Sequence, residues 1–591
     1  MRTRIRAALA LITGALLATA GHASALPGTA DRSPAAHAPA AQREARETAT
    51  ADPAYEVLVF SKTAGFRHSS IDDGIAALRA LGTANNFTVT ATEDAAAFTG
   101  GNLAQYEAVV FLSTTGDVLN GAQQTAFEQY IQAGGGYVGI HAAADTEYDW
   151  PFYEGLAGAL FHSHPAIQSA TVKVEDRAHD ATAHLGGTWQ RTDEWYNYRT
   201  NPRTTAHVLA SLDESSYSGG SMSGDHPISW CKDYRGGRAF YTGGGHTDES
   251  YTEPAFRRHL LGGIRWAAGM TEADCRPETG YRPLFDGSGT TGWQQAGPGG
   301  FTLADGTLTS DGGLGMLWYA AEEFTGDYSL KADWKTAGDD NSGIFVGFPA
   351  SDDPWSAVNN GYEIQIDATD EPERTTGAVY GFRSADLAAR DAALNPPGEW
   401  NTYEIRVTGE RLELFLNGRK INDFTNTDPA RSLAQGHIGI QNHGDGDEVS
   451  FRNIRVKTSD PAPGPRSGRV TGVNGKCLDV DGARNTDGTK VQLWTCNGTD
   501  AQKWTLPGDG TLRALGKCLD ISGGATADGT KTQLWTCNGT DAQKWTPQPD
   551  GTVRNPQSAK CLDASGGTWN DGTPVHLWTC HTGPNQKWTL P

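Results

Sequence analysis

Apolar residues follow two different periods along the chain, and the change of period divides it into segments. From Tyr55 onward, short apolar runs such as 56–61 and 107–113 alternate with amphipathic stretches such as 120–133. Runs that are apolar throughout are typical of strands buried on both faces, and the stretches between them have a helical period. We therefore predict an α/β domain over residues 54–270, built on a doubly wound, mostly parallel sheet.

Between residues 281 and 458 the helical period gives way to alternation. Segments 403–407 and 412–416 alternate apolar and polar residues, and Asn417-Gly418 follows as a hairpin turn. A period of two is that of a strand with one buried face. This part of the chain is therefore predicted to be an all-β antiparallel sandwich.

Three copies of one unit make up residues 468–591, which follow a proline-rich linker at 459–467. Each copy carries the motifs CLD, LWTC and QKW in the same order. A cysteine pair recurs at the same spacing in every copy, which predicts three disulfides, Cys477–Cys496, Cys518–Cys537 and Cys561–Cys580. By even count alone, the two remaining cysteines, Cys231 and Cys275, are expected to pair.

The first residues have the features of a targeting segment. Residues 1–25 begin with three arginines, continue as an apolar run and end in Ala23-Ser24-Ala25, as secretory signal peptides do. Residues 26–53 have no hydrophobic period and are predicted to be a disordered linker. No later stretch has the roughly 18 consecutive apolar residues of a membrane span. We expect a secreted, extracellular protein without a membrane span.

Charge narrows the choice of partner. The chain has 48 Lys+Arg against 70 Asp+Glu and a formal net charge of −22. A surface of this sign repels phosphates, which argues against a nucleic-acid partner. Neutral partners such as sugars are compatible with it. The sequence leaves the oligomeric state open.

The threefold repeat resembles the ricin-type β-trefoil lectin family. In that family an aspartate, an aromatic ring and an amide clamp one sugar in each lobe, which suits a pyranose with an apolar face and an edge of hydroxyls. The resemblance implies three carbohydrate-binding pockets: Asp479, Trp494 and Gln502; Asp520, Trp535 and Gln543; and Asp563, Trp578, Asn585 and Gln586.

The three lobes differ at one position of the predicted pocket. Only the third has an asparagine before the glutamine of QKW, because the other two have Ala501 and Ala542. The third pocket is therefore expected to bind best, and three weak sites together would give avidity on a polymer. The alternative is that the three aspartates only satisfy backbone groups of the repeat.

Two segments of the sandwich carry polar rows. In 362–367 alternation places Glu363, Gln365 and Asp367 on one face, and 437–443 repeats the arrangement. The segment resembles the 3-keto-disaccharide hydrolase family, a concanavalin-like sandwich, through DNSGIFVGF (340–348), GYEIQID (361–367) and TGAVYGF (376–382). The resemblance implies hydrolysis of glycosides.

Candidate residues of the middle domain follow from the polar rows and the resemblance. Glu363, Asp367 and His443 are predicted to be catalytic, with Asn341 and Gln365 contacting the substrate. A two-carboxylate mechanism and an elimination next to a C3 ketone both remain open. The family commonly has an arginine where this chain has Gly347, which favours the alternative that the domain only binds sugar.

Histidines are concentrated in the first domain, which holds ten of the 16. Ligands of doubly wound sheets bind at the carboxyl ends of the strands, where several of these histidines are predicted to lie. The domain resembles the trehalose-utilisation (ThuA-like) family through FHSHP (161–165), DEWY (193–196) and GGGH (243–246). We predict His141 and His246 as catalytic residues, and His68, His164 and Glu194 as substrate-binding residues.

Glutamine hydrolysis and metal binding are two further possibilities for this domain. Its fold is shared with class I glutamine amidotransferases, but His141-Ala142 stands where such enzymes need a nucleophilic cysteine, so glutamine hydrolysis is excluded. We expect hydrogen-bonded neutral histidines, with no metal or other cofactor. A metal ion held by His162 or His164, Glu194 and His246 stays open as the alternative.

Together these features predict a secreted carbohydrate-active enzyme of three domains. It would hydrolyse glycosides, with 3-keto-disaccharides as one candidate substrate, while its C-terminal lectin domain binds a polysaccharide or glycoside-rich surface. The alternative is a non-catalytic protein with three carbohydrate-binding modules. A third hypothesis is a toxin-like fusion that uses its lectin domain to bind cell surfaces, but the sequence has no toxin motif to support it.

Overall fold

The structure, a computed structural model, describes residues 51–458, 466–506, 510–548, 551–566 and 569–590. The predicted signal peptide and almost all of the two predicted linkers lie outside these residues. Within the described part of the chain, no helix is long and apolar enough to cross a membrane.

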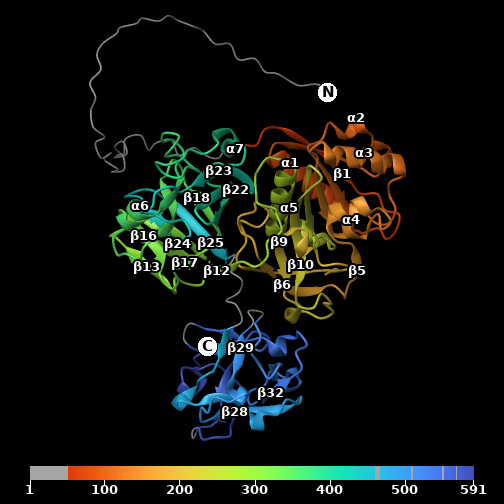
Figure 1. Cartoon of the computed structure of the whole chain (residues 1–591). Coiled ribbons are helices and arrows are strands. Elements are labelled where there is room, and N and C mark those ends of the chain that lie inside the picture. The colour runs from red at the N-terminus through yellow and green to blue at the C-terminus, as the bar shows by residue number, and fades with distance from the viewer. Residues whose placement is uncertain (1–50, 459–465, 507–509, 549–550, 567–568, 591) are drawn as a thin grey trace, which may run out of the picture. The chain divides into compact units, whose positions relative to one another are not determined.

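The first domain is an α/β fold on a nine-stranded sheet (Figure 1). Its strand order is β2-β1-β3-β4-β11-β10-β9-β6-β7. The first five of these are parallel: β2 (Phe87–Thr92), β1 (Tyr55–Phe60), β3 (Ala108–Leu112), β4 (Gly136–Ile140) and β11 (Gly237–Thr242). The other four continue the sheet in antiparallel pairs: β10 (His226–Tyr234), β9 (His207–Leu212), β6 (Gln168–Val174) and β7 (Thr188–Asp193).

Helices pack on both faces of this sheet, as predicted for a doubly wound fold. Helices α1 (Ile71–Ala84) and α5 (Pro254–Ala267) share one apolar cluster with it. Helices α3 (Gly121–Gln132) and α4 (Pro151–Ala157) contribute to the cluster of the opposite face. Because β1, β3, β4 and β11 run parallel, their carboxyl ends meet at one edge, and the loops that follow them are brought together there.

The middle domain is an antiparallel sandwich whose core lies between two sheets. One has the order β14 (Gly300–Ala304), β15 (Thr307–Asp311), β25 (Val449–Thr458), β18 (Tyr328–Thr336), β21 (Asn401–Thr408), β22 (Arg411–Leu416) and β23 (Arg419–Thr425). The other has the order β13 (Trp293–Ala296), β16 (Gly315–Tyr319), β24 (Gln435–Asn442), β19 (Ser342–Phe348) and β20 (Tyr362–Ile366). The predicted hairpin joins β22 to β23, and both its residues, Asn417 and Gly418, have positive φ as a type I′ turn requires.

The C-terminal domain is a trefoil of short strands in which every repeat contributes the same elements. In the first copy these are β27 (Cys477–Val480), β28 (Thr489–Trp494) and β29 (Trp504–Leu506). The tryptophans of the three QKW motifs are buried in the common core: Trp504, Trp545 and Trp588. All four predicted disulfides are present: Cys231–Cys275, Cys477–Cys496, Cys518–Cys537 and Cys561–Cys580.

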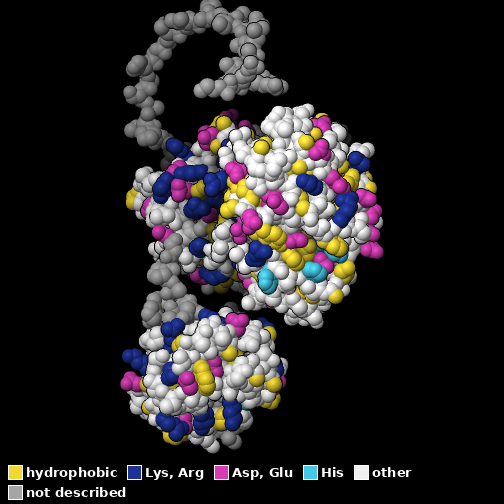
Figure 2. Space-filling view, turned by 90° about the vertical axis from the view of Figure 1, so that its right-hand side faces the viewer, with side chains coloured by type: hydrophobic (Ala, Val, Ile, Leu, Met, Phe, Trp, Pro, Cys, Tyr) yellow, Lys and Arg dark blue, Asp and Glu magenta, His cyan; other side chains and the backbone are white. Residues whose placement is uncertain are grey.

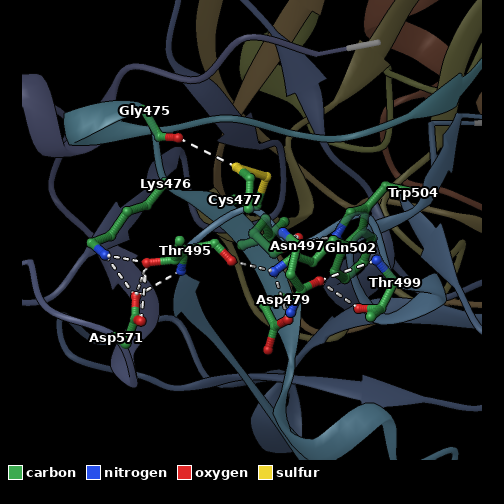
Figure 3. Close-up of a disulfide and its surroundings, with 12 residues drawn as sticks. Gly475, Lys476, Cys477, Asp479, Thr495, Asn497, Thr499, Gln502, Trp504 and Asp571 are labelled. Carbon is green, nitrogen blue, oxygen red and sulfur yellow. Dashed lines mark hydrogen bonds and ion pairs between the residues drawn. A yellow bond between two sulfur atoms is a disulfide. The ribbon is translucent and has the colours of Figure 1, made fainter.

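An aspartate from each lobe binds the next lobe. Asp571 of the third lobe accepts hydrogen bonds from Lys476 and from both the backbone and the hydroxyl of Thr495 in the first (Figure 3). Asp487 of the first lobe binds the second in the same way, and Asp528 of the second binds the third. These contacts, here called the aspartate clasps, close the three lobes into a ring.

Removing one disulfide of a lobe is expected to destabilise the trefoil. In the chain-entropy model, closing a loop with the 19-residue separation of Cys561 and Cys580 is worth about 3 kcal/mol. The double variant Cys561→Ser/Cys580→Ser should therefore lower the thermal midpoint of the trefoil transition in calorimetry. The matched variant Cys231→Ser/Cys275→Ser should lower that of the α/β domain instead, and a trefoil transition that does not move in the first variant contradicts the expectation.

Candidate functional site

The carboxyl edge of the α/β sheet gathers histidines from separate loops. His141 follows β4 directly, with a positive φ of 50° and a fully buried ring. Its Nδ1 lies 2.9 Å from the carbonyl oxygen of Gly243. Since a carbonyl only accepts, Nδ1 carries the proton, and the lone pair of Nε2 points to His246 Nδ1 at 3.1 Å.

Glu194 joins three of these histidines. One carboxylate oxygen lies 3.1 Å from His246 Nδ1 and 3.5 Å from His141 Nε2, and the other lies 2.9 Å from His164 Nδ1. Burial opposes ionisation of Glu194, but the polar contacts of its carboxylate with His141 and His246 outweigh it and hold its pKa well below the usual range. Glu194 is therefore an anion at neutral pH.

His68 completes the group from the loop after β1. Its ring is 4% exposed and lies 4.9 Å from the ring of His141 and 5.0 Å from that of His246. Burial, followed by the neighbouring histidines, lowers the pKa of His68 to about 3, so its imidazole is neutral. Among the described residues, its Nδ1 has no hydrogen-bond partner.

The edge thus unites all five residues predicted for this domain. His68, His141, Glu194 and His246 each place one nitrogen or oxygen within 4.8 Å of the others, a group called here the histidine cluster. His164 lies beside it on Glu194, and histidine side chains reach the surface of this domain (Figure 2). His162, named in the alternative metal site, is exposed and is not a member of the cluster.

Asp193 and Tyr196 were missed by the sequence prediction. The buried carboxylate of Asp193 accepts the backbone N–H groups of Gly245 at 2.8 Å and His246 at 3.0 Å, which fixes the loop after β11. The ring of Tyr196 lies 4.3 Å from that of His141. Both residues belong to the same DEWY motif as Glu194, and that motif was the available signal.

The polar face of the sandwich carries a buried carboxyl group. Glu363 lies on β20 and is 5% exposed, and its carboxyl group lies over Gly343 of the neighbouring strand β19. Burial raises the pKa of Glu363 to about 8, and a hydrogen bond with Gln441 of β24 only partly offsets this. Glu363 is therefore protonated at neutral pH and can donate a proton.

Adding one methyl group at Gly343 is expected to impair the site. A Cβ at this position would overlap the Glu363 carboxyl oxygen, whereas the backbone of Gly343 does not need positive φ. Gly343→Ala should therefore displace the carboxyl and lower kcat on a cleavable sugar about tenfold or more, with little change in the thermal midpoint. Gly338→Ala, at a position open to solvent, is the matched control, and equal rates in the two variants contradict the expectation.

Asp367, Asn341 and Gln365 form a connected row beside Glu363. Asn341 Nδ2 donates to Asp367 at 2.7 Å, and Gln365 Nε2 donates to Asn341 at 3.2 Å. The other oxygen of Asp367 accepts the backbone N–H groups of Thr369 and Asp370. Asp367 already accepts three hydrogen bonds, which fix its carboxylate in place.

His443 lies just beyond β24 at the same end of the sheet. Its Nδ1 is 2.9 Å from an oxygen of Asp447, whose other oxygen accepts the backbone N–H of Asn341. Because the carboxylate is an acceptor, Nδ1 carries the proton, and Nε2 is left with the lone pair of a base. Asp447 was not predicted, because it lies in an irregular loop.

Gly347 has a structural reason for lacking a side chain. Its φ is +69°, β19 has a register shift there, and a Cβ would overlap the carbonyl oxygen of Ser432. An arginine is therefore excluded at this position by the backbone. Near the site, Arg374 lies 5.7 Å from the ring of Tyr380, and the backbone N–H of Tyr380 donates to the carbonyl of Glu363.

The three trefoil lobes repeat one arrangement around the CLD aspartate. Asp479 accepts a hydrogen bond from Gln502 Nε2 at 3.0 Å beside the first disulfide (Figure 3). It accepts a second one from Gln492 Nε2 at 3.1 Å. Asp520 is held in the same way by Gln533 and Gln543. The pocket tryptophans are among the few large apolar side chains that are exposed: Trp494 at 38%, Trp535 at 38% and Trp578 at 40%.

The third pocket differs in its donors. Asp563 accepts hydrogen bonds from His576 at 2.9 Å, Asn585 at 2.8 Å and Gln586 at 2.9 Å. The ring of His576 stacks on Trp578. A third residue of each pocket stands two positions before its exposed tryptophan: Gln492, Gln533 or His576. The sequence prediction missed it in every lobe, although the repeated QLW and HLW motifs contain it.

Three family models match the chain, one over each of these folds. The model for trehalose utilisation (ThuA) matches residues 56–267, that for a 3-keto-alpha-glucoside-1,2-lyase-like domain matches 280–457, and that for a ricin-type beta-trefoil lectin domain matches 466–588.

Curated relatives cover parts of the chain. The 3-keto-disaccharide hydrolase of Bacteroides thetaiotaomicron is 26% identical over 236 residues, which is 31% of this chain and 79% of that protein. Beta-galactoside-specific lectin 2 of Viscum album is 38% identical over 68 residues, 11% of either chain. The chain therefore spans most of the hydrolase but only about a tenth of the lectin.

Solved structures match the first two domains. A ThuA-like protein from Bacteroides uniformis is 25% identical, with 37% of this chain and 94% of that chain covered and a TM-score of 0.33. A protein from Parabacteroides distasonis described as a glycosyl hydrolase is 24% identical, with 31% and 94% covered and a TM-score of 0.27.

Proposed function

We propose that this protein, which combines a ThuA-like domain, a 3-keto-disaccharide hydrolase-like domain and a ricin-type lectin domain, cleaves glycosides with Glu363 as general acid. The observation that carries the proposal is the burial of Glu363, which keeps its carboxyl group protonated at neutral pH. A carboxylic acid of this kind can protonate the oxygen of a departing sugar. The similarity to a 3-keto-disaccharide hydrolase supports a substrate oxidised at C3.

A base is available on the same sheet. His443, oriented by Asp447, would take the proton from the carbon next to the C3 ketone, where the ketone makes the C–H acidic. The electron pair left behind forms a carbon–carbon double bond as the C1–O bond breaks, and the leaving oxygen takes the proton of Glu363. Water then adds its hydroxyl to C1 and its proton to Glu363, while His443 returns its proton to carbon.

Asp367 is assigned a positioning role in this scheme. Three hydrogen bonds from Asn341, Thr369 and Asp370 occupy its carboxylate, which makes it a poor nucleophile. Its bond to Asn341 in turn orients Gln365. This favours the elimination over the two-carboxylate mechanism, in which Asp367 would have to attack the substrate.

The remaining parts would deliver the enzyme to its substrate. Sugar binding by the trefoil would hold it on a polysaccharide or glycoside-rich surface, with the exposed tryptophans stacking on the rings. Secretion fits the four disulfides, which persist in oxidising compartments.

A substrate comparison tests the proposed reaction. The full chain is incubated with a disaccharide and with the same disaccharide oxidised at C3, beside His443→Ala and the distant control His162→Ala. We expect the unaltered chain to cleave the keto sugar. His443→Ala should cleave it much more slowly, and His162→Ala at the rate of the unaltered chain. Cleavage of only the unoxidised sugar contradicts the elimination, and cleavage of neither sugar supports a non-catalytic carbohydrate-binding protein.

A further inference from the structure

We propose that the histidine cluster of the α/β domain binds one divalent transition-metal ion. Its four potential ligand atoms, from His68, His141, Glu194 and His246, lie within 4.8 Å of one another. Ligand atoms around an ion with bonds of about 2.1 Å are about 3–4 Å apart. Small side-chain movements therefore suffice to bring all four onto one ion.

The hydrogen bonds around the cluster are those of metal ligands. His141 donates a hydrogen bond from Nδ1 to the carbonyl of Gly243, which leaves Nε2 facing Glu194 and His246 as the potential ligand atom. Metal-bound histidines typically fix their other nitrogen on a carbonyl in this way. His164 on the outer oxygen of Glu194 similarly orients the carboxylate, with its inner oxygen toward the cluster.

His68 provides the independent observation. It is almost completely buried, yet no described residue makes a hydrogen bond with its Nδ1. A buried polar atom without a partner costs about 1–3 kcal/mol, so such atoms are rare unless a ligand satisfies the group. The ring stands edge-on to His141 and His246 and brings an uncommitted imidazole to the cluster.

The ligand set selects the class of ion. Three imidazoles and one carboxylate suit Zn²⁺ and Mn²⁺ and their neighbours in the first transition series, whereas Mg²⁺ and Ca²⁺ prefer oxygen ligands throughout. Four donors complete a tetrahedral Zn²⁺ and leave two positions for oxygen ligands on an octahedral ion. The other group of potential ligands among the described residues, His179 with Cys231 and Cys275, is excluded because both sulfurs are in a disulfide.

Metal titration of the full chain tests the inference. After removal of metals with EDTA, Zn²⁺ and Mn²⁺ are titrated separately by calorimetry, with Mg²⁺ and Ca²⁺ in parallel. We expect one Zn²⁺ or Mn²⁺ per chain and no binding of Mg²⁺ or Ca²⁺ at this site. His141→Ala and Glu194→Gln should weaken binding at least tenfold, whereas His162→Ala, a nearby exposed histidine outside the cluster, should bind as the unaltered chain does.

A spectroscopic measurement covers the case in which His141→Ala does not fold. Co²⁺ bound to three nitrogens and one oxygen gives d–d absorption bands, and these should disappear in Glu194→Gln, which keeps the size of the side chain. The absence of stoichiometric Zn²⁺ and Mn²⁺ binding, or equal affinity and equal Co²⁺ spectra in Glu194→Gln, overturns the inference. Neither result bears on sugar cleavage in the middle domain, so the two proposals fail separately.

Discussion

Glu363→Gln is expected to lower kcat on a 3-keto-disaccharide by about 10²–10⁴-fold, with a much smaller change in KM. Glutamine has the size of the protonated carboxyl but cannot give a proton to the leaving oxygen. The measurement is steady-state kinetics of the full chain. Glu448→Gln, at an exposed position of the same domain, is the matched control and should retain the rate.

The same substitution has a pH signature. With a folded pKa of about 8, Glu363 loses its proton as the pH rises through 8, so the rate of the unaltered enzyme should fall there. The pKa of folded Glu363 lies above the ordinary value of 4.5, so the stability that protonated Glu363 contributes is complete below about pH 4.5 and is lost as the pH rises to 8. Glutamine does not titrate, so Glu363→Gln should be the more stable protein at pH 8.

Loss of activity together with a gain in stability separates a catalytic acid from a merely structural residue. By linkage the gain at pH 8 is at most about 4 kcal/mol, measured as a higher thermal midpoint of the sandwich transition. A variant that turns over normally removes Glu363 from the mechanism. A variant that is both inactive and less stable at pH 8 would instead place Glu363 among the residues that hold the fold.

Replacing the CLD aspartates of all three lobes by asparagine is expected to abolish glycan binding. Each carboxylate is aligned by amide or imidazole donors to accept sugar hydroxyls, and a hydrogen bond to a charged group is worth about 1.5–3 kcal/mol. The triple variant Asp479→Asn/Asp520→Asn/Asp563→Asn should therefore lose at least 100-fold in apparent affinity for immobilised glycan. Thr546→Ala, at an exposed position outside the pockets, is the control, and unchanged binding by the triple variant contradicts the assignment.

Single substitutions rank the pockets. Asp563 has Asn585 as an additional donor, whereas the positions that correspond to Asn585 in the first two lobes hold Ala501 and Ala542. Asp563 also accepts from His576, where the other lobes have a glutamine. Asp563→Asn alone should thus reduce binding more than Asp479→Asn alone. Equal effects would mean that Asn585 adds nothing to recognition.

The sequence predicted those parts of the sites that follow from strand position. Parallel strands end at one edge, so His68, His141 and His246 could be placed together although they are far apart in the chain. For the alternative metal site the choice between His162 and His164 stayed open, because His162 lies on the short strand β5 (Phe161–Ser163) and His164 just after it, and only tertiary packing decides which of them points to Glu194. The raised pKa of Glu363 comes from burial against other strands, such as β19 with Gly343, and no local sequence pattern reports such an environment.

Other features were missed because their meaning is non-local. The four antiparallel strands β10, β9, β6 and β7 extend the predicted parallel sheet. Their position was missed because the alternation of apolar residues in a strand does not show which edge of a sheet it joins. The aspartates of the clasps precede glycines in each repeat, and such Asp-Gly pairs are typical of turns. Their partners lie in another lobe.

The aspartate clasps determine how the lectin can meet a glycan. The last lobe is bound to the first by the same contacts that bind each lobe to its successor, so the three pockets repeat around a closed ring. We therefore expect them to face different directions, so that one straight oligosaccharide would reach only one of them. Tight attachment would then require branches or neighbouring chains that surround the module, so a dense polysaccharide surface would retain the protein while short soluble fragments would dissociate.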